Sequence, residues 1–202
     1  MSINDVGMLF SFIGGLGLFL YGMNIMADGL QKSAGGKMQK LMGFLTKNRL
    51  MAILVGAGVT AIIQSSSATT VMVVGFVNAG MLELAQAVGV IMGANIGTTI
   101  TGQLIALDVG APAPLIAFVG VAILVLVKNT KIQHIAGIVA GIGVLFIGMD
   151  MMSSAMSPLR EEPQFVEMMT KFSNPLLGIL VGAGFTALIQ SSSASVGILQ
   201  AL

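Results

Sequence analysis

Residues 53–68 read ILVGAGVTAIIQSSSA, and residues 179–194 read ILVGAGFTALIQSSSA. The two stretches are identical at 14 of 16 positions and are separated by a constant offset of 126 residues. The same offset, without a gap, aligns Gly22 with Gly148, more than thirty residues upstream. Composition bias alone does not align a Gln-Ser-Ser-Ser block together with a distant anchor, so the sequence contains an internal duplication.

The composition excludes a water-soluble protein. Of the 202 residues, 55% are hydrophobic and 8% are charged, against about 25% charged in an ordinary soluble domain. A net charge of +1 excludes the basic face that nucleic-acid binding requires, so we expect no nucleic-acid partner. With no cysteine and one histidine, thiolate and imidazole metal centres are excluded. A mean hydropathy of +0.98 and 27 glycines are typical of a polytopic helical membrane protein.

The duplicated segment is apolar but too short to cross a membrane on either side of its polar block. A crossing of about 30 Å needs about 20 helical residues, and the apolar run before Gln64 has only about two thirds of that length. Polar backbone at mid-membrane depth is tolerated only beside protein or a water-filled cavity. We therefore expect a re-entrant helical hairpin over about 50–82 with its tip at 64–67. A second hairpin is expected from about 175, with its tip at 190–193.

These elements predict an all-α polytopic membrane protein with inverted structural repeats, each carrying a QSSS hairpin. Repeat 1 covers 1–131, with a span at about 8–28, the hairpin, a broken span at 84–107 and a span at 113–127. A partial repeat 2 covers 132–202 and starts with a span at about 132–154. Because each repeat would cross the membrane three times, an odd number, the second copy is expected to have the opposite orientation in the membrane. Seven of the nine basic residues fall on one side, which the positive-inside rule makes cytoplasmic, so the N-terminus is predicted outside.

Inverted repeats with broken helices that meet at mid-membrane are typical of secondary transporters, in which half-helix N-termini bind anions. Serine hydroxyls and free backbone amides donate hydrogen bonds without adding a fixed positive charge, which suits a small oxyanion. The glutamine amides add donors and an acceptor. The alternative is that the serines only bond their own helix or permit close packing. The candidate anion-binding residues are Gln64, Ser65, Ser66, Ser67, Gln190, Ser191, Ser192 and Ser193.

A second polar stretch, GANIGTT at 93–99, is followed by Thr101 and Gln103 within the next apolar run. We interpret it as a break whose unwound carbonyls, together with Asn95, Thr98 and Thr99, supply the oxygen ligands that a dehydrated Na⁺ needs. The alternative is a glycine-mediated kink with the threonines bonding their own backbone.

Asp150 lies within an apolar run and is a candidate coupling residue, because an ionisable group at membrane depth is costly. Its partner in the first repeat is the neutral Asn24. The alternative is a carboxylate close enough to the outer interface to be hydrated.

The paired QSSS motifs, with GANIGTT after the first, resemble the type II sodium/phosphate cotransporter family and its bacterial relatives. The resemblance covers almost the whole chain. It implies that the two QSSS tips form the site for inorganic phosphate. It also implies Na⁺ ligands in and around 93–99, for which we name Asn95, Thr98 and Thr99 with Ser67 and Ser193. Na⁺ would be the co-transported ion, and no organic cofactor is implied.

Members of that family continue beyond the second QSSS motif. Here the partner of 93–99 would fall at positions 219–225, beyond Leu202. We therefore expect a partial chain, with half of any cation site missing unless a second subunit supplies it, as a homodimer would. The sequence predicts a sodium-coupled phosphate transporter with alternating access, integral to the inner or plasma membrane and in contact with lipid. The alternatives are transport of another oxyanion or a dicarboxylate, or a non-transporting membrane subunit or sensor. An enzyme is not expected.

Overall fold

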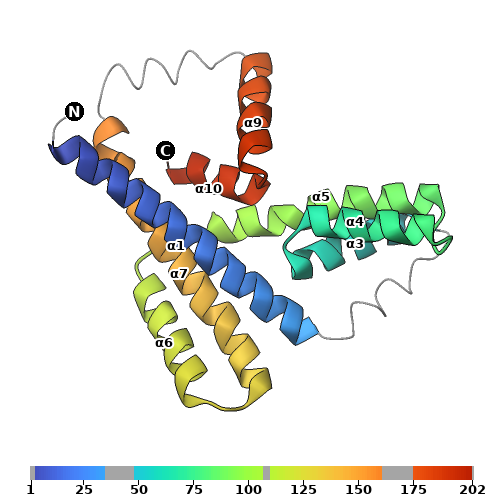
Figure 1. Ribbon diagram of the computed structural model, residues 1–202, viewed down its shortest axis with the longest axis horizontal. Coiled ribbons are helices and arrows are strands. Elements are labelled where there is room, and N and C mark those ends of the chain that lie inside the picture. Colours follow the sequence, from blue (N-terminus) through green and yellow to red (C-terminus); the bar gives the residue numbers. More distant parts are fainter. Residues whose placement is uncertain (1–2, 35–47, 107–109, 161–174, 202) are drawn as a thin grey trace.

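The computed structural model describes residues 3–34, 48–106, 110–160 and 175–201, and all regular structure in these ranges is helical (Figure 1). The helices are α1 (Ile3–Ala34), α3 (Arg49–Ile63), α4 (Ser66–Asn78), α5 (Leu84–Ile105), α6 (Ala113–Leu126), α7 (Thr130–Arg160), α9 (Pro175–Ile189) and α10 (Ser192–Ala201). The prediction of an all-α chain is therefore confirmed. The first span and the span after residue 131 are longer than predicted, at 32 and 31 residues.

Three of these helices are long and apolar enough to cross a membrane: α1 over Val6–Ala34, α5 over Leu84–Ile105, and α7 over Thr130–Pro158. The pair α9 and α10 is also apolar, but it bends by 120° at its break. α3, α4 and α6 are shorter apolar helices. This pattern supports an integral membrane protein, because helices of α1, α5 and α7 length match the hydrocarbon thickness.

α1 and α7 pack against each other in antiparallel directions along most of their length (Figure 1). Glycines allow the short distance between the two helices. A Cβ atom built on Gly22 would lie 2.3 Å from the backbone nitrogen of Leu145. A Cβ atom on Gly148 would likewise lie 2.3 Å from the backbone nitrogen of Phe19. The duplication relates Gly22 to Gly148 and Phe19 to Leu145, so the same contact occurs twice. Small residues are what bring membrane helices this close.

α3, α4 and α5 form a second group of helices, in which α3 and α5 run parallel (Figure 1). A Cβ atom on Gly93 would lie 2.0 Å from the Ile53 carbonyl oxygen, and one on Gly97 would lie 2.5 Å from that of Ala57. Either methyl group would therefore push the two helices apart. The glycines of GANIGTT therefore form the face of α5 against which α3 packs.

The predicted break of the span 84–107 is wrong, because α5 is a continuous α-helix from Leu84 to Ile105. The Thr98 hydroxyl donates to the Ala94 carbonyl at 3.1 Å, and the Thr99 hydroxyl donates to the Ile96 carbonyl at 2.7 Å. Hydroxyls that bond to the preceding turn satisfy their polarity inside a helix. The threonines therefore bond their own backbone, as the alternative reading had it, and the glycines serve packing rather than unwinding.

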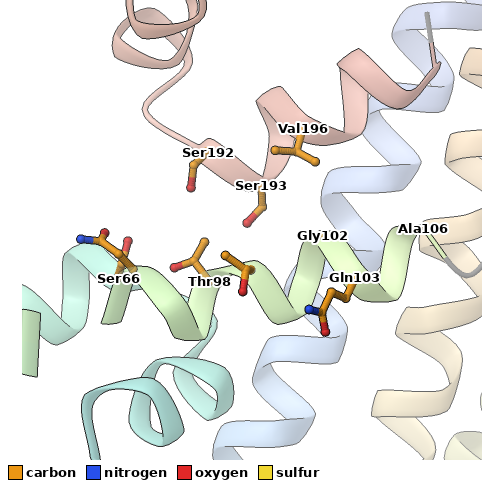
Figure 2. A pocket seen from close by; sticks show the side chains of 10 residues that line it. Ser66, Thr98, Gly102, Gln103, Ala106, Ser192, Ser193 and Val196 are labelled. Atoms are coloured by element: carbon orange, nitrogen blue, oxygen red, sulfur yellow. The ribbon is translucent and has the colours of Figure 1, made fainter. Parts of the chain in front are cut away.

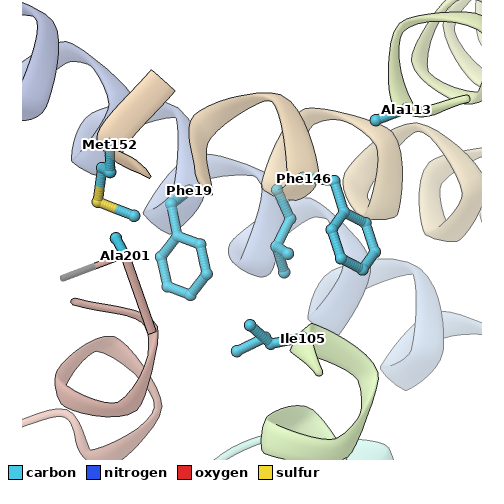
Figure 3. Packing of buried hydrophobic residues seen from close by; sticks show 7 residues of the cluster. Phe19, Ile105, Ala113, Phe146, Met152 and Ala201 are labelled. Carbon is cyan, nitrogen blue, oxygen red and sulfur yellow. The ribbon is translucent and has the colours of Figure 1, made fainter. Parts of the chain in front are cut away.

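The two groups of helices meet at a buried apolar cluster formed by Phe19, Ile105, Ala113, Leu145, Phe146, Met152 and Ala201 (Figure 3). The end of α5 and the end of α10 both reach this cluster, beside α1 and α7. A Cβ atom on Gly197 of α10 would lie 2.5 Å from the Phe19 ring. This close contact fixes α10 against α1, and so places the start of α10 over α5.

Candidate anion-binding site

The chain turns sharply between α3 and α4 at the first QSSS motif. Gln64 ends α3 in the left-handed backbone region, with φ 59° and ψ 24°, and its backbone N–H donates to the Thr60 carbonyl at 2.7 Å. Ser65 then caps α4: its hydroxyl accepts from the backbone N–H of Ala68 at 3.2 Å. Serine is a favoured N-cap residue for this reason. The motif therefore contains both a helix stop and a helix start.

The second motif repeats this geometry bond for bond. Gln190 has φ 58°, and its backbone N–H donates to the Thr186 carbonyl at 2.8 Å. The Ser191 hydroxyl accepts from the backbone N–H of Ala194 at 3.2 Å. The same local sequence thus adopts the same turn in two different packing environments, since α9 buries none of its residues while α3 buries five.

A hydroxyl pair joins the two half-helices across each break. The Thr60 hydroxyl donates to the Thr69 hydroxyl at 3.0 Å, and both side chains are fully buried. In the second copy the Thr186 hydroxyl donates to the Ser195 hydroxyl at 3.1 Å. Buried polar groups are stable only when they are paired, so each pair holds its turn in one conformation.

The glutamine amides are engaged within the fold. In both copies the amide nitrogen donates to a carbonyl three residues earlier at 2.6 Å, from Gln64 to Ala61 and from Gln190 to Ala187. The side-chain oxygen of Gln64 also accepts from the buried Thr101 hydroxyl of α5. The Gln64 amide thus stabilises the turn and links it to α5.

The two motifs meet at a single pocket of about 480 Å³ (Figure 2). Its walls come from the start of α4, one face of α5 and the start of α10. In Figure 2, Ser192 and Ser193 extend from α10 toward α5. The lining residues are Ser66, Asn95, Thr98, Thr99, Gly102, Gln103, Ala106, Ser192, Ser193 and Val196.

Six of the sequence-predicted site residues line this pocket: Ser66, Ser192, Ser193, Asn95, Thr98 and Thr99. Ser65 and Ser191 act as helix caps at its edge. Gln64, Gln190 and Ser67 are not among its lining residues. Asp150 lines other pockets, and neither Asp150 nor Asn24 is among the residues that line this one. The structure therefore separates the candidate coupling residues from the pocket.

Gln103 is not among the sequence-predicted site residues, although it lines the pocket with Gly102 and Ala106. Asn95, Thr99, Gly102, Gln103 and Ala106 share one face of a straight helix, because they follow helical spacing. This spacing is present in the sequence, but a helix broken at 93–99 would not place these residues on one face.

None of the described side chains that line the pocket carries a charge. The polar groups that face the pocket are hydroxyls and amides, together with the first turns of α4 and α10. The first backbone N–H groups of a helix lack intrahelical acceptors, and they carry a partial positive charge. Two such helix starts at one pocket favour an anion, while the hydroxyl and amide oxygens can also accept a cation.

Fold and pocket together define a helical membrane protein with a neutral, hydrogen-bonding site between two copies of one turn. Residues 18–154 match the Na+/Pi-cotransporter family. The match covers more than half of the chain, which therefore belongs to this family.

Several curated proteins are similar to this chain. It is 26% identical over 189 residues to the "Putative inorganic phosphate export protein YjbB" of Escherichia coli K12, an alignment that covers 93% of this chain and 35% of that protein. It is 30% identical over 192 residues to the uncharacterized protein YqeW of Bacillus subtilis, covering 95% and 62%. It is 36% identical over 105 residues to the human sodium-dependent phosphate transport protein 2B, covering 50% and 15%.

The chain thus spans about a third of the length of the phosphate export proteins it matches. No solved structure matches it significantly.

Proposed function

We propose that this chain forms the phosphate-binding core of a sodium-coupled transporter of inorganic phosphate. The observation that carries the proposal is the single pocket lined by serines of both QSSS motifs and by Asn95, Thr98 and Thr99 of α5. The anion would accept hydrogen bonds from Ser66, Ser192 and the first backbone N–H groups of α4 and α10. The family membership and the relatives' names favour phosphate over other oxyanions.

The neutrality of the pocket is the argument for sodium coupling. Phosphate carries one to two negative charges near neutral pH, and an uncompensated charge in a membrane is costly. A pocket without a basic side chain therefore needs a cation that arrives with the anion. Because α5 is continuous, its backbone carbonyls remain within the helix. The Na⁺ ligands would be the side-chain oxygens of Asn95, Thr98 and Thr99, with Ser193 from α10.

The architecture proposed for this site is a pair of re-entrant hairpins in inverted repeats. Three observations support it: the duplicated turns, the paired glycine contacts of α1 with α7, and their antiparallel directions. An antiparallel pair of repeat-related helices is what an inverted repeat requires. Alternating access would follow from movement of one group of helices against the other, with the N-terminus outside.

The experiment is labelled-phosphate binding and uptake by the purified chain in liposomes, with a Na⁺ gradient or an equal K⁺ gradient. Ser66→Ala and Ser192→Ala each remove one hydrogen bond to a charged ligand, a loss of about 1.5–3 kcal/mol, or roughly tenfold or more in affinity. Ser33→Ala is the matched control, because this exposed serine lies at the end of α1, away from the pocket. Unchanged binding in both pocket variants would refute the assignment.

The direction of transport and its coupling are tested by the same preparation. One relative is named as an exporter and another as sodium-dependent. We expect an inward Na⁺ gradient to drive accumulation of phosphate, and reversal of the gradient to reverse the flux. Phosphate that binds only with Na⁺ but never moves would favour a non-transporting subunit. Sulfate that competes equally with phosphate would favour a broader oxyanion site.

A further inference from the structure

Asp150 lies within α7, where its side chain is exposed, and outside the pocket described above. Only two carboxylates of the described residues fall inside a candidate span: Asp28 in Val6–Ala34 and Asp150 in Thr130–Pro158. Asp150 precedes the end of its span by eight residues, which is roughly 12 Å along the helix axis. A carboxylate within a membrane-spanning segment is costly, so it calls for a partner of opposite charge.

The duplication supplies an internal comparison for this carboxylate. Asp28 aligns with Ser154, and Asn24 aligns with Asp150. Each copy therefore keeps one carboxylate and one neutral oxygen-bearing side chain four residues apart, in opposite order. Residues four apart lie on the same face of a helix, so both copies place the pair together.

The two carboxylates differ in what neutralises them. In the first copy the ammonium of Lys32 lies 2.6 Å from the Asp28 carboxylate, as an ion pair within α1. The position that aligns with Lys32 in the second copy is Pro158. Lys32 lies four residues after Asp28, whereas the residue four positions after Asp150 is Ser154. The comparison points to a cation from solution in the role of Lys32.

The surroundings of Asp150 have room and ligands for a cation. It lines a pocket of about 370 Å³ between α1 and α7, together with Ser11 of α1 and Ser154 of α7. It also lines a smaller pocket of about 90 Å³ with Gln200 of α10. Among the residues that the structure describes, neither pocket is lined by a basic side chain. The ligands on offer are carboxylate, hydroxyl and amide oxygens, the set that suits a hard cation.

We propose that Asp150, with Ser11 and Ser154, forms a second monovalent cation site between α1 and α7, separate from the phosphate pocket. One carboxylate balances one positive charge, whereas Ca²⁺ and Mg²⁺ sites rely on further anionic ligands. The choice of Na⁺ as the ion rests on the proposed function. The site itself rests on Asp150 and its pockets.

The test uses the absence of cysteine from the sequence. Met8 of α1 lines the same pocket as Asp150 and is not one of the proposed ligands, so Met8→Cys provides a unique reporter. The purified chain in nanodiscs is labelled with a maleimide in NaCl or in choline chloride of equal ionic strength, without phosphate. Labelling should slow roughly tenfold when Na⁺ is about ten times its dissociation constant, if binding excludes the reagent.

Two variants decide whether Asp150 holds the ion. Asp150→Asn in the Met8→Cys background should label at the same rate in Na⁺ and in choline, with Asp150→Ser as a second neutral replacement should the first fail to fold. Asp28→Asn is the matched control and should keep full protection. Protection should also persist with Ser66→Ala, which separates this site from failure of the phosphate pocket. Protection that survives Asp150→Asn, is absent from the parent, or appears on acidification without Na⁺ would overturn the proposal.

Discussion

Gln64 and Gln190 occupy a backbone region that non-glycine residues avoid, with φ of 59° and 58°. The left-handed conformation costs an L-residue roughly 1–2 kcal/mol, and glycine would adopt it freely. Both copies nevertheless carry glutamine. The side chain explains this, because its amide bonds to the carbonyl of the preceding turn in each copy, and in the first copy also to Thr101. In each copy these side-chain hydrogen bonds offset the cost of the strained backbone and hold the turn in one conformation.

At the residue scale, the Thr101 hydroxyl is predicted to stabilise the first turn. Thr101→Val leaves the Gln64 side-chain oxygen without this donor, which should lower the free energy of unfolding by about 1–3 kcal/mol. Thr101→Ser should restore most of it. Thr70→Val is the matched control: its hydroxyl bonds only within α4, at 2.8 Å to the Ser66 carbonyl, and the expected change is about 0.5 kcal/mol or less. Thermal unfolding in detergent measures all three. Equal effects of Thr101→Val and Thr70→Val would contradict the prediction.

At the element scale, α5 has one face that packs against a helix and another that lines the pocket. One carries Gly89, Gly93 and Gly97, against which α3 packs. The other carries Asn95, Thr99 and Gln103, which line the pocket. Because the helix is continuous, the spacing along the first face fixes the position of α3 along α5, and hence the position of its turn at Gln64. The packing face therefore places the first QSSS motif over the polar face.

The packing face yields a prediction with an internal control. Gly93→Ala would bring a methyl group to within 2.0 Å of the Ile53 carbonyl, so the helices must separate. We expect a loss of about 1–3 kcal/mol in unfolding free energy and weaker phosphate binding. Gly75→Ala on α4 meets no atom within 4 Å. It should be neutral or should stabilise the helix by up to about 1 kcal/mol. Thermal unfolding and phosphate binding test both, and tolerance of Gly93→Ala would show that α3 does not rest on this face.

At the scale of the whole molecule, the structure divides into α1 with α6 and α7, and α3 with α4 and α5, joined at the cluster around Phe19 (Figures 1 and 3). α10 contacts both groups. It carries Ser192 and Ser193 to the pocket from the far end of the sequence. A movement between the two groups would therefore alter the pocket, which is what a transporter with alternating access needs.

The proposed re-entrant path predicts where the turn after α4 lies. Met81 follows α4 and is exposed, and Asn129 lies between α6 and α7. If α3 and α4 enter and leave on the cytoplasmic side, Met81→Cys and Asn129→Cys should both react with an impermeant maleimide only after the membrane is opened. Immediate reaction of Met81→Cys in intact cells, with Asn129→Cys protected, would mean that α3 and α4 together cross the membrane.

The sequence was sufficient for features that depend on local chemistry. The QSSS block specifies a helix stop and a serine cap through bonds between near neighbours, so two identical copies give two identical turns. The apolar runs likewise predicted the helices, and the motifs identified the family. Six predicted site residues line the pocket, because each lies on an element whose ends the sequence marks.

Tertiary structure alone decided which residues face one another. The sequence does not show whether Gly93 and Gly97 unwind α5 or let α3 pack closely against it, because a residue without a side chain permits either. The position of the partner helix α3 decides between them. The Thr101 contact with Gln64 and the pocket that Asp150 shares with Ser11 join residues far apart in the chain. Such contacts depend on how helices pack against each other, and local sequence carries no record of the partner.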